Sequence, residues 1–210
     1  MCWNAEVSLN TFIFSISVLL LILFSKNKIA EFDSIWMYIF FFSFISMQLI
    51  EYFIWKNINN KYYNNLFSIM ATLLLIWLPV TTLMCIKGND ILKWILLLIY
   101  LIIVGPFTIY KFMTKNIYSK ISPMHHLHWD FLTNKKEFYY WSVWMFFFLF
   151  SFLYNLELVG LIFGVILLLI MIYNYKTDGT IGSMWCWIVN SIMLYYAAYL
   201  LIYLPLIQIQ

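Results

Sequence analysis

Six side chains of this sequence have the chemistry to form a reactive or metal-binding site, and most of them stand near the edges of apolar stretches. Cys2 and Cys186 each lie beside a tryptophan, in MCWN and in MWCW, where an apolar run is about to begin. The other four are Glu51 and the three histidines of the stretch HHLHW. Thiolates, imidazoles and carboxylates are ligands of zinc and copper, and a thiol is also a nucleophile. The sequence therefore predicts a transition-metal or thiol site if these residues meet.

The histidines of HHLHW can share a face in two ways. His125 and His128 lie on one face if the stretch is helical, whereas His126 and His128 do so if it is extended. Both spacings occur in zinc and copper sites. The alternative is that the stretch packs at the membrane surface with Trp129 as an anchor.

Glu51 is the acid that lies well inside an apolar run. A charged side chain at the centre of a membrane helix costs about 2.5–3.5 kcal/mol on insertion scales, so an acid kept there is a candidate functional residue. Gln48 precedes it by one helical turn and can hydrogen-bond to it. We expect Glu51, Gln48, Trp55 and Trp185 to bind an ion or a small molecule.

Composition places all these residues in a membrane protein. Apolar residues make up 65% of the 210-residue chain and charged residues 10%, against about 45–50% and about 25% in ordinary proteins. That much apolar surface cannot face water, so we predict a polytopic membrane protein with the lipid bilayer as its main partner. The net charge of +3 is small and dispersed, which argues against nucleic-acid binding.

Seven apolar runs are long enough to cross the hydrocarbon layer, which is about 30 Å thick, as helices. They cover about residues 9–24, 34–55, 65–86, 91–112, 138–154, 157–175 and 183–206. Uninterrupted apolar runs do not fit the strands of a membrane barrel. We therefore expect an all-α fold, a seven-transmembrane-helix bundle that forms one domain over residues 1–210, with a long loop at 113–137.

An odd number of crossings brings the candidate residues to one face of the membrane. With seven crossings, Cys2, the end of the second helix with Glu51, the histidine loop and the start of the last helix with Cys186 share the N-terminal side. Eight of the twelve lysines are expected on this side and four on the opposite side. Because lysine is enriched in cytoplasmic loops, the N-terminus is predicted to be cytoplasmic.

Missing residues exclude several known kinds of membrane site. The chain has no arginine for a voltage sensor, and the last apolar run has no lysine for a retinal Schiff base. No apolar run contains a histidine, which argues against the multi-histidine zinc site of ceramidase-like hydrolases. Phosphate-loop, H-E-x-x-H and G-x-S-x-G motifs are absent as well.

Four motifs resemble those of an uncharacterised family of seven-helix membrane proteins from bacteria, algae and large DNA viruses. The family pattern begins Met-Cys-Phe/Trp-Ser/Asn, has Gln-x-x-Glu-x-x-x-Trp in the second helix and Trp-x-Pro in the third, and opens the last helix with Gly-Ser-x-Trp-Cys. The matching residues are Met1-Cys2-Trp3-Asn4, then Gln48, Glu51 and Trp55, then Trp77 and Pro79, and finally Gly182, Ser183, Trp185 and Cys186. The resemblance implies a seven-helix fold and a shared site, and it implies no reaction.

Three classes of function are compatible with these patterns. The first is a transporter or channel-like protein in which Glu51 binds an ion or small molecule, with Pro79 and Gly105-Pro106 as hinges. The second is a membrane-embedded enzyme or a metal or thiol redox site that uses Cys2, Cys186 and either His125 or His128. The third is a structural or host-interaction protein in which the motifs only pack the bundle.

Overall fold

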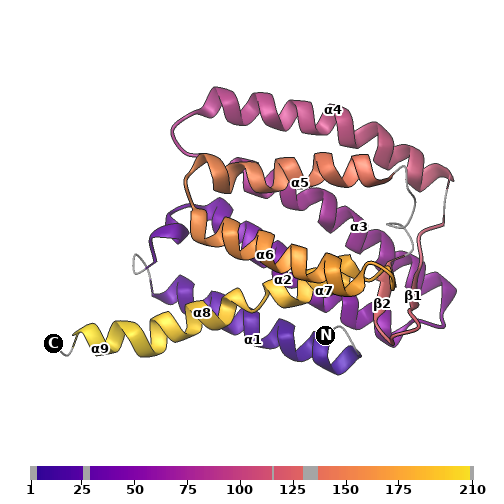
Figure 1. Cartoon of the computed structure of the whole chain (residues 1–210), viewed down its shortest axis with the longest axis horizontal. Helices are drawn as coiled ribbons and strands as arrows, with labels where there is room; N and C mark the ends of the chain where they lie inside the picture. The colour runs from indigo at the N-terminus through magenta and orange to yellow at the C-terminus, as the bar shows by residue number, and fades with distance from the viewer. Residues whose placement is uncertain (1–3, 26–28, 115, 130–136, 209–210) are drawn as a thin grey trace.

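The computed structural model describes residues 4–25, 29–114, 116–129 and 137–208, and it confirms the all-α class. Six helices run back and forth along the long axis of the molecule (Figure 1): α1 (Ala5–Phe24), α2 (Ile35–Lys56), α3 (Lys61–Met84), α4 (Asp90–Thr114), α5 (Glu137–Tyr154) and α6 (Leu158–Tyr175). A short 3-10 turn, η1 (Ala30–Asp33), precedes α2. The last pass is an interrupted helix made of α7 (Ile181–Val189), α8 (Ile192–Ala198), the π-helical segment η3 (Tyr199–Tyr203) and α9 (Leu204–Gln208).

Among the described residues, five helical segments are long and apolar enough to cross a membrane. They are α1 to α4 and the 27-residue segment Ile181–Ile207. The apolar parts of α5 and α6, Tyr140–Tyr154 and Gly160–Tyr175, are shorter. These lengths agree with an integral membrane protein, and the arrangement with seven crossings stays a prediction.

Polar side chains fix where several helices begin. Asn4, Ser34 and Asn60 cap α1, α2 and α3 by accepting hydrogen bonds from free backbone N–H groups of the first turn. The prolines that were expected to act as hinges, Pro79 and Pro106, lie inside α3 and α4, and each helix continues through its proline as one element.

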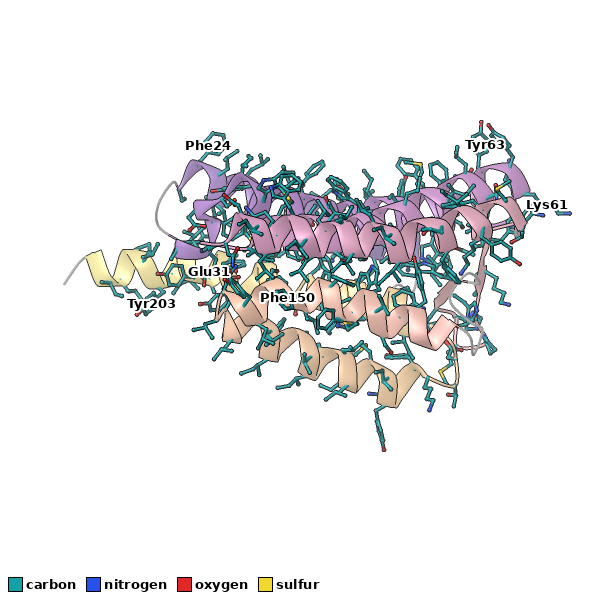
Figure 2. The ribbon with its side chains drawn as sticks, turned by 90° about the horizontal axis from the view of Figure 1, so that it is seen from above. Phe24, Glu31, Lys61, Tyr63, Phe150 and Tyr203 are labelled. Atoms are coloured by element: carbon teal, nitrogen blue, oxygen red, sulfur yellow. The ribbon has the colours of Figure 1, made fainter. Side chains whose placement is uncertain are left out.

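The core lies around α2, which packs against α1 and α3, while α3 packs against α5. At one end of the bundle lie Lys61 and Tyr63, and at the other end lie Glu31 and Tyr203 (Figure 2). Between these polar ends α6 exposes an apolar stripe to the outside. Its members are spaced three or four residues apart and are all at least half exposed: Ile162, Ile166, Leu169 and Tyr173. A stripe of this kind fits contact with lipid.

The long loop contains a β-hairpin that the sequence analysis did not predict. Strands β1 (Ser119–Ile121) and β2 (Leu127–Trp129) pair antiparallel, with Ser119 opposite Trp129. The hairpin lies at the end of the bundle where α1 begins, which we call the N-terminal side (Figure 1). Trp129 is only 2% exposed, so it lies in the interior and not as an anchor at the membrane surface.

Candidate functional site

Glu51 and Gln48 form a polar pair inside the bundle. Both side chains are on the interior face of α2 and both have no exposed surface. Gln48 Nε2 donates a hydrogen bond of 3.0 Å to Glu51 Oε2. This is the partnership expected from their spacing of one helical turn.

The start of α7 brings Trp185 and Cys186 into the same interior. Cys186 is 1% exposed, and the Glu51 carboxyl is close enough to interact electrostatically with its thiol. Trp185 is also buried, and its Nε1 donates a hydrogen bond of 3.2 Å to the carbonyl of Gly164 in α6. The structure therefore brings Glu51, Gln48, Cys186 and Trp185 to the same part of the molecule.

Two other residues expected in the site, Trp55 and Cys2, are not placed with these four. Trp55 is partly buried at the end of α2, and its Nε1 has no hydrogen-bond partner among the described residues. Cys2 lies outside the described residues, so the structure places no second thiol beside Cys186.

Three further polar residues that sequence analysis missed are also buried: Ser8 and Ser15 on α1, and Asn190 at the end of α7. At a rise of 1.5 Å per residue, Ser8, Glu51 and Cys186 all lie about 5–8 Å from the N-terminal-side end of their helices. Ser15, Gln48 and Asn190 all lie about 12–15 Å from it. Helix α1 contacts both α2 and α8, and Trp187 Nε1 donates to Thr11 Oγ1 at 3.1 Å, which ties α7 to α1.

We call Ser8, Ser15, Gln48, Glu51, Cys186 and Asn190 the polar cluster. Four of its oxygen atoms have no hydrogen-bond partner among the described residues: Ser8 Oγ, Ser15 Oγ, Gln48 Oε1 and Asn190 Oδ1. A buried polar atom left without a partner costs about 1–3 kcal/mol. These oxygens therefore have the capacity to bind a cation, a polar ligand or water.

The β-hairpin lies on the N-terminal side and is hydrogen-bonded to α3. Asn64 Nδ2 donates to the carbonyl of Ser119 and Asn64 Oδ1 accepts from the N–H of Ser119, both at 2.9 Å. The hydroxyls of Ser68 and Ser119 are 2.9 Å apart. All three side chains are buried, so the hairpin is held by polar contacts away from solvent.

Asp178, in the loop before α7, holds the other side of the hairpin. Its carboxylate accepts hydrogen bonds from Ser122 Oγ at 2.7 Å, Thr180 Oγ1 at 3.0 Å and the N–H of Met124 at 3.4 Å. Burial tends to raise the pKa of Asp178, but these hydrogen bonds outweigh it and the pKa lies below its ordinary value. Ser183 Oγ completes the attachment by donating to the carbonyl of Leu127 at 2.6 Å, which links the hairpin to α7.

The three histidines of the hairpin differ in their exposure to solvent. His125 is exposed and has a left-handed backbone, with φ of 59°, whereas His126 and His128 are 7% and 8% exposed. His128 Nδ1 lies 3.3 Å from the carbonyl oxygen of Asp178. Burial lowers the pKa of His126, although the nearby Asp178 carboxylate opposes that change. Because β2 is extended, His126 and His128 are the buried pair, which is the alternative expected for an extended stretch, and the helical alternative with His125 and His128 on one face does not apply.

A metal centre finds little support in this geometry. Among the described residues there is no group of three or more His, Cys, Asp and Glu side chains placed to hold a metal ion. The part of the metal hypothesis that needs Cys2 lies outside those residues.

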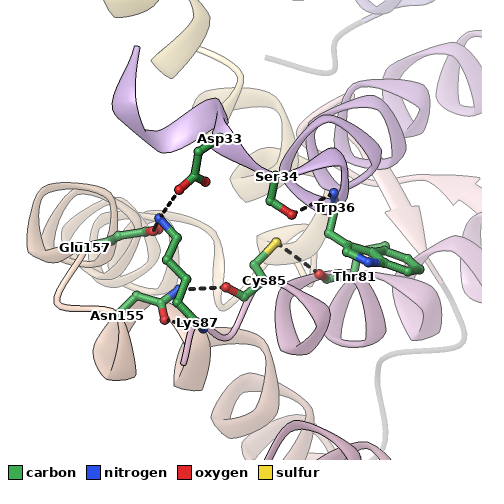
Figure 3. Close-up of polar contacts among 8 residues, drawn as sticks. All are labelled: Asp33, Ser34, Trp36, Thr81, Cys85, Lys87, Asn155 and Glu157. Carbon is green, nitrogen blue, oxygen red and sulfur yellow. Dashed lines mark hydrogen bonds and ion pairs between the residues drawn. The ribbon is translucent and has the colours of Figure 1, made fainter. Parts of the chain in front are cut away.

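The opposite side of the bundle is closed by loop contacts around Lys87 (Figure 3). Lys87 Nζ lies 3.0 Å from Asp33 and 3.7 Å from Glu157, and so it joins three connecting segments. Asn155 adds two hydrogen bonds, from its Nδ2 to the carbonyl of Cys85 at 2.9 Å and from the Lys87 N–H to its Oδ1 at 3.1 Å. The polar cluster thus lies between the hairpin at one end of the bundle and these loop contacts at the other.

Comparisons of the chain with protein-family models, with curated proteins and with solved structures give no match.

Proposed function

We propose that the protein crosses the membrane seven times and acts as a transporter or channel-like protein for a small cation, with Glu51 as the binding carboxylate. Helices α5 and α6 have 18 residues each, which at 1.5 Å per residue is about 27 Å and close to the hydrocarbon thickness of about 30 Å. The start of α1 and the end of α9 lie at opposite ends of the bundle (Figure 1), as an odd number of crossings requires.

The observation that carries the proposal is a completely buried carboxylate among oxygen acceptors that have no partner. Glu51 has no exposed surface, and the unpaired atoms of the polar cluster, on Gln48 beside it and on Ser8, Ser15 and Asn190 at similar levels of the bundle, are all oxygens. Hard cations are bound by carboxylate, carbonyl and hydroxyl oxygens. An acid in the interior of a membrane protein is typical of ion pathways and proton relays.

The closed ends of the bundle fit a protein that binds its ion away from water. The β-hairpin covers the N-terminal side, and the loop contacts around Lys87 cover the other side. In this proposal an ion reaches Glu51 when one of these closures opens. The hairpin is one such closure, and its attachment combines hydrogen bonds to Asn64 and Asp178 with the buried side chains of Leu127 and Trp129.

Ion flux into proteoliposomes tests this function. We expect the wild-type protein to conduct or exchange at least one of Na⁺, K⁺ and H⁺, measured with ion-sensitive dyes inside the vesicles. Glu51→Gln keeps the shape of the side chain and can still accept the hydrogen bond from Gln48, so the variant should fold. We expect it to lose at least about ten-fold in rate, because a missing charge in a buried ion site costs more than 1.4 kcal/mol.

Glu6→Gln is the matched control, because Glu6 is exposed in the first turn of α1 and lies outside the polar cluster. It should conduct like the wild type. Equal thermal unfolding curves for the three proteins would show that lost flux is not lost folding. If Glu51→Gln conducts at the wild-type rate, or if wild-type vesicles take up no more of the three ions than empty ones do, the proposal fails.

The family resemblance and the cytoplasmic N-terminus extend this proposal. Two of the family motifs contribute residues to the polar cluster: the motif of the second helix contributes Gln48 and Glu51, and the motif of the last helix contributes Cys186. This supports a shared site. The excess of lysines on the N-terminal side supports a cytoplasmic position for it.

A further inference from the structure

An apolar groove with a volume of about 830 Å³ lies between α5, α6 and the start of α7. Helices α5 and α6 are joined at the side opposite the hairpin and diverge towards the N-terminal side (Figures 1 and 2). Trp185 and Cys186 of α7 line the groove together with Trp129 of the hairpin. Its volume is within the range of sites that bind small organic ligands, about 300–1,000 Å³.

Helix α6 presents two different faces to its surroundings. Leu161, Leu168 and Ile172 line the groove, whereas the neighbouring residues Ile162 and Leu169 belong to the outer stripe. On α5, side chains from Trp141 to Leu153, several of them adjacent in the sequence, line the opposite wall. The groove is therefore lined by one face of α6 and extends along both helices.

The length of the groove matches a lipid chain. From Trp141 to Leu153 the α5 wall is about 18 Å long, and from Leu161 to Lys176 the α6 wall is about 22 Å long. One leaflet of the hydrocarbon layer is about 15 Å thick, half of the total. A groove of this length accommodates an acyl chain that enters from the N-terminal side.

A positive charge stands at the wide end of the groove. Lys176 follows the last residue of α6, is exposed and lines the groove. It forms no ion pair with any of the described residues. Lysines at the end of a membrane helix lie at the level of the lipid head groups, where they attract phosphate.

We propose that this groove binds an anionic glycerophospholipid, with one acyl chain between α5 and α6 and the phosphate beside Lys176. The apolar walls, the length and the charge of Lys176 at the head-group level select this ligand over a soluble one. The proposal goes beyond cation binding at Glu51, and neither depends on the other.

Native mass spectrometry of the full chain in a neutral detergent tests the proposal with two lipids that have the same acyl chains, phosphatidylglycerol and phosphatidylcholine. A lysine near the surface should favour the anionic lipid by roughly five-fold. Lys176→Gln should lower the affinity for phosphatidylglycerol to that for phosphatidylcholine. Lys56→Gln, at the end of α2 on the same side of the membrane, is the control and should keep the preference.

Blocking the groove gives the second arm of the test. Leu168→Trp fills the groove, whereas Leu169→Trp places the same side chain on the outer face one residue away. We expect at least a ten-fold loss of affinity for both lipids in the first variant and no change in the second. Leu149→Trp blocks the groove from α5 and serves if Leu168→Trp does not fold.

Two results would overturn the lipid site: equal affinity of the wild type for both lipids, or wild-type affinity in folded variants that fill the groove. Glu51→Gln should bind both lipids like the wild type, because Glu51 does not line the groove. Failure of the ion proposal and failure of the lipid proposal are therefore distinguishable.

Discussion

At the scale of single residues, the sequence indicates Glu51 and Gln48 but hides Ser8 and Ser15. An acid in an apolar run is conspicuous, and its partner one turn away follows from helix geometry. A serine in such a run is not conspicuous, because its hydroxyl usually bonds to a carbonyl of its own helix. Ser17 does this with Ile13 at 2.7 Å. Sequence alone does not tell which serines face the interior without such a bond.

Gly179 is a residue whose replacement should weaken the hairpin. Its φ is +71°, and a Cβ added there would lie 2.5 Å from His128 Cε1. We expect Gly179→Ala to lower the free energy of unfolding by about 2–3 kcal/mol, because backbone strain and a clash with a buried ring add together. Thermal unfolding of the purified protein in detergent measures the change.

Gly88 offers a matched control for that substitution. Its φ is +74°, nearly the same, and nothing lies within 4 Å of an added Cβ. Gly88→Ala should therefore cost only about 1 kcal/mol, from backbone strain alone. Equal losses in the two variants would mean that the contact with His128 contributes nothing.

At the scale of elements, periodicity and charge locate the helices, but they do not reveal the hairpin. Its strands have three residues each and no alternating pattern, and they are fixed by partners far along the chain. Ser119 needs Asn64 and Ser122 needs Asp178, which are 55 and 56 residues away. Such strands follow from tertiary contacts, which local propensity does not contain.

The interruption of the last helix was also not predicted from the sequence. The run 183–206 was expected to be one helix, but α7 ends at Val189 and α8 begins at Ile192. The intervening residues include neither glycine nor proline. Asn190 Nδ2 donates to the carbonyl of Cys186 at 2.7 Å, and this bond is local competition with regular backbone bonding.

The hairpin should loosen in mild acid because of His126. Burial lowers the pKa of His126, so the unfolded state takes up its proton first as the pH falls. The stabilisation is complete above the ordinary pKa near 6.5 and is lost as the pH falls below it. We expect faster hydrogen exchange in residues 119–129 at pH 5.5 than at pH 7.5, after correction for the intrinsic rates.

Two variants test whether His126 causes this pH dependence. His126→Gln should remove most of it, while His125→Gln, next to it and exposed, should keep it. The low pKa of Asp178 acts in the same direction but only in stronger acid, below its ordinary value of 3.8. A profile that is identical in the wild type and in His126→Gln would refute the assignment to His126.

At the scale of the whole molecule, the two ends of the bundle are closed by different kinds of interaction. The hairpin uses buried hydrogen bonds, whereas Lys87 uses ion pairs in which its own side chain is 47% exposed. Exposed ion pairs contribute about 0–1 kcal/mol and are screened by salt. The side opposite the hairpin is therefore held more by Asn155 than by charge.

Comparison of Asn155→Ala with Lys87→Met tests this ranking. The asparagine variant loses two hydrogen bonds to backbone groups and should lower the free energy of unfolding by about 1–2 kcal/mol. The lysine variant keeps its backbone N–H and should lose less than about 1 kcal/mol. The reverse order, measured by thermal unfolding at physiological salt, would show that the ion pairs dominate.

The number of crossings makes a prediction of its own. Seven crossings place the two ends of the chain on opposite sides of the membrane, whereas six would place them together. Short tags added at each end should therefore react differently with an antibody applied to intact cells. If both tags react, or neither does before permeabilisation, the seven-crossing proposal is wrong.

The attachments of the hairpin also determine when it can settle during synthesis. Asn64 leaves the ribosome before β1 does, but Asp178 follows Ser122 by 56 residues. At about 5–20 residues per second, Asp178 is therefore synthesised about 3–11 s after Ser122. During those seconds the hairpin is attached only to Asn64, and its free strand edge is accessible to a chaperone or a protease at the translocation site.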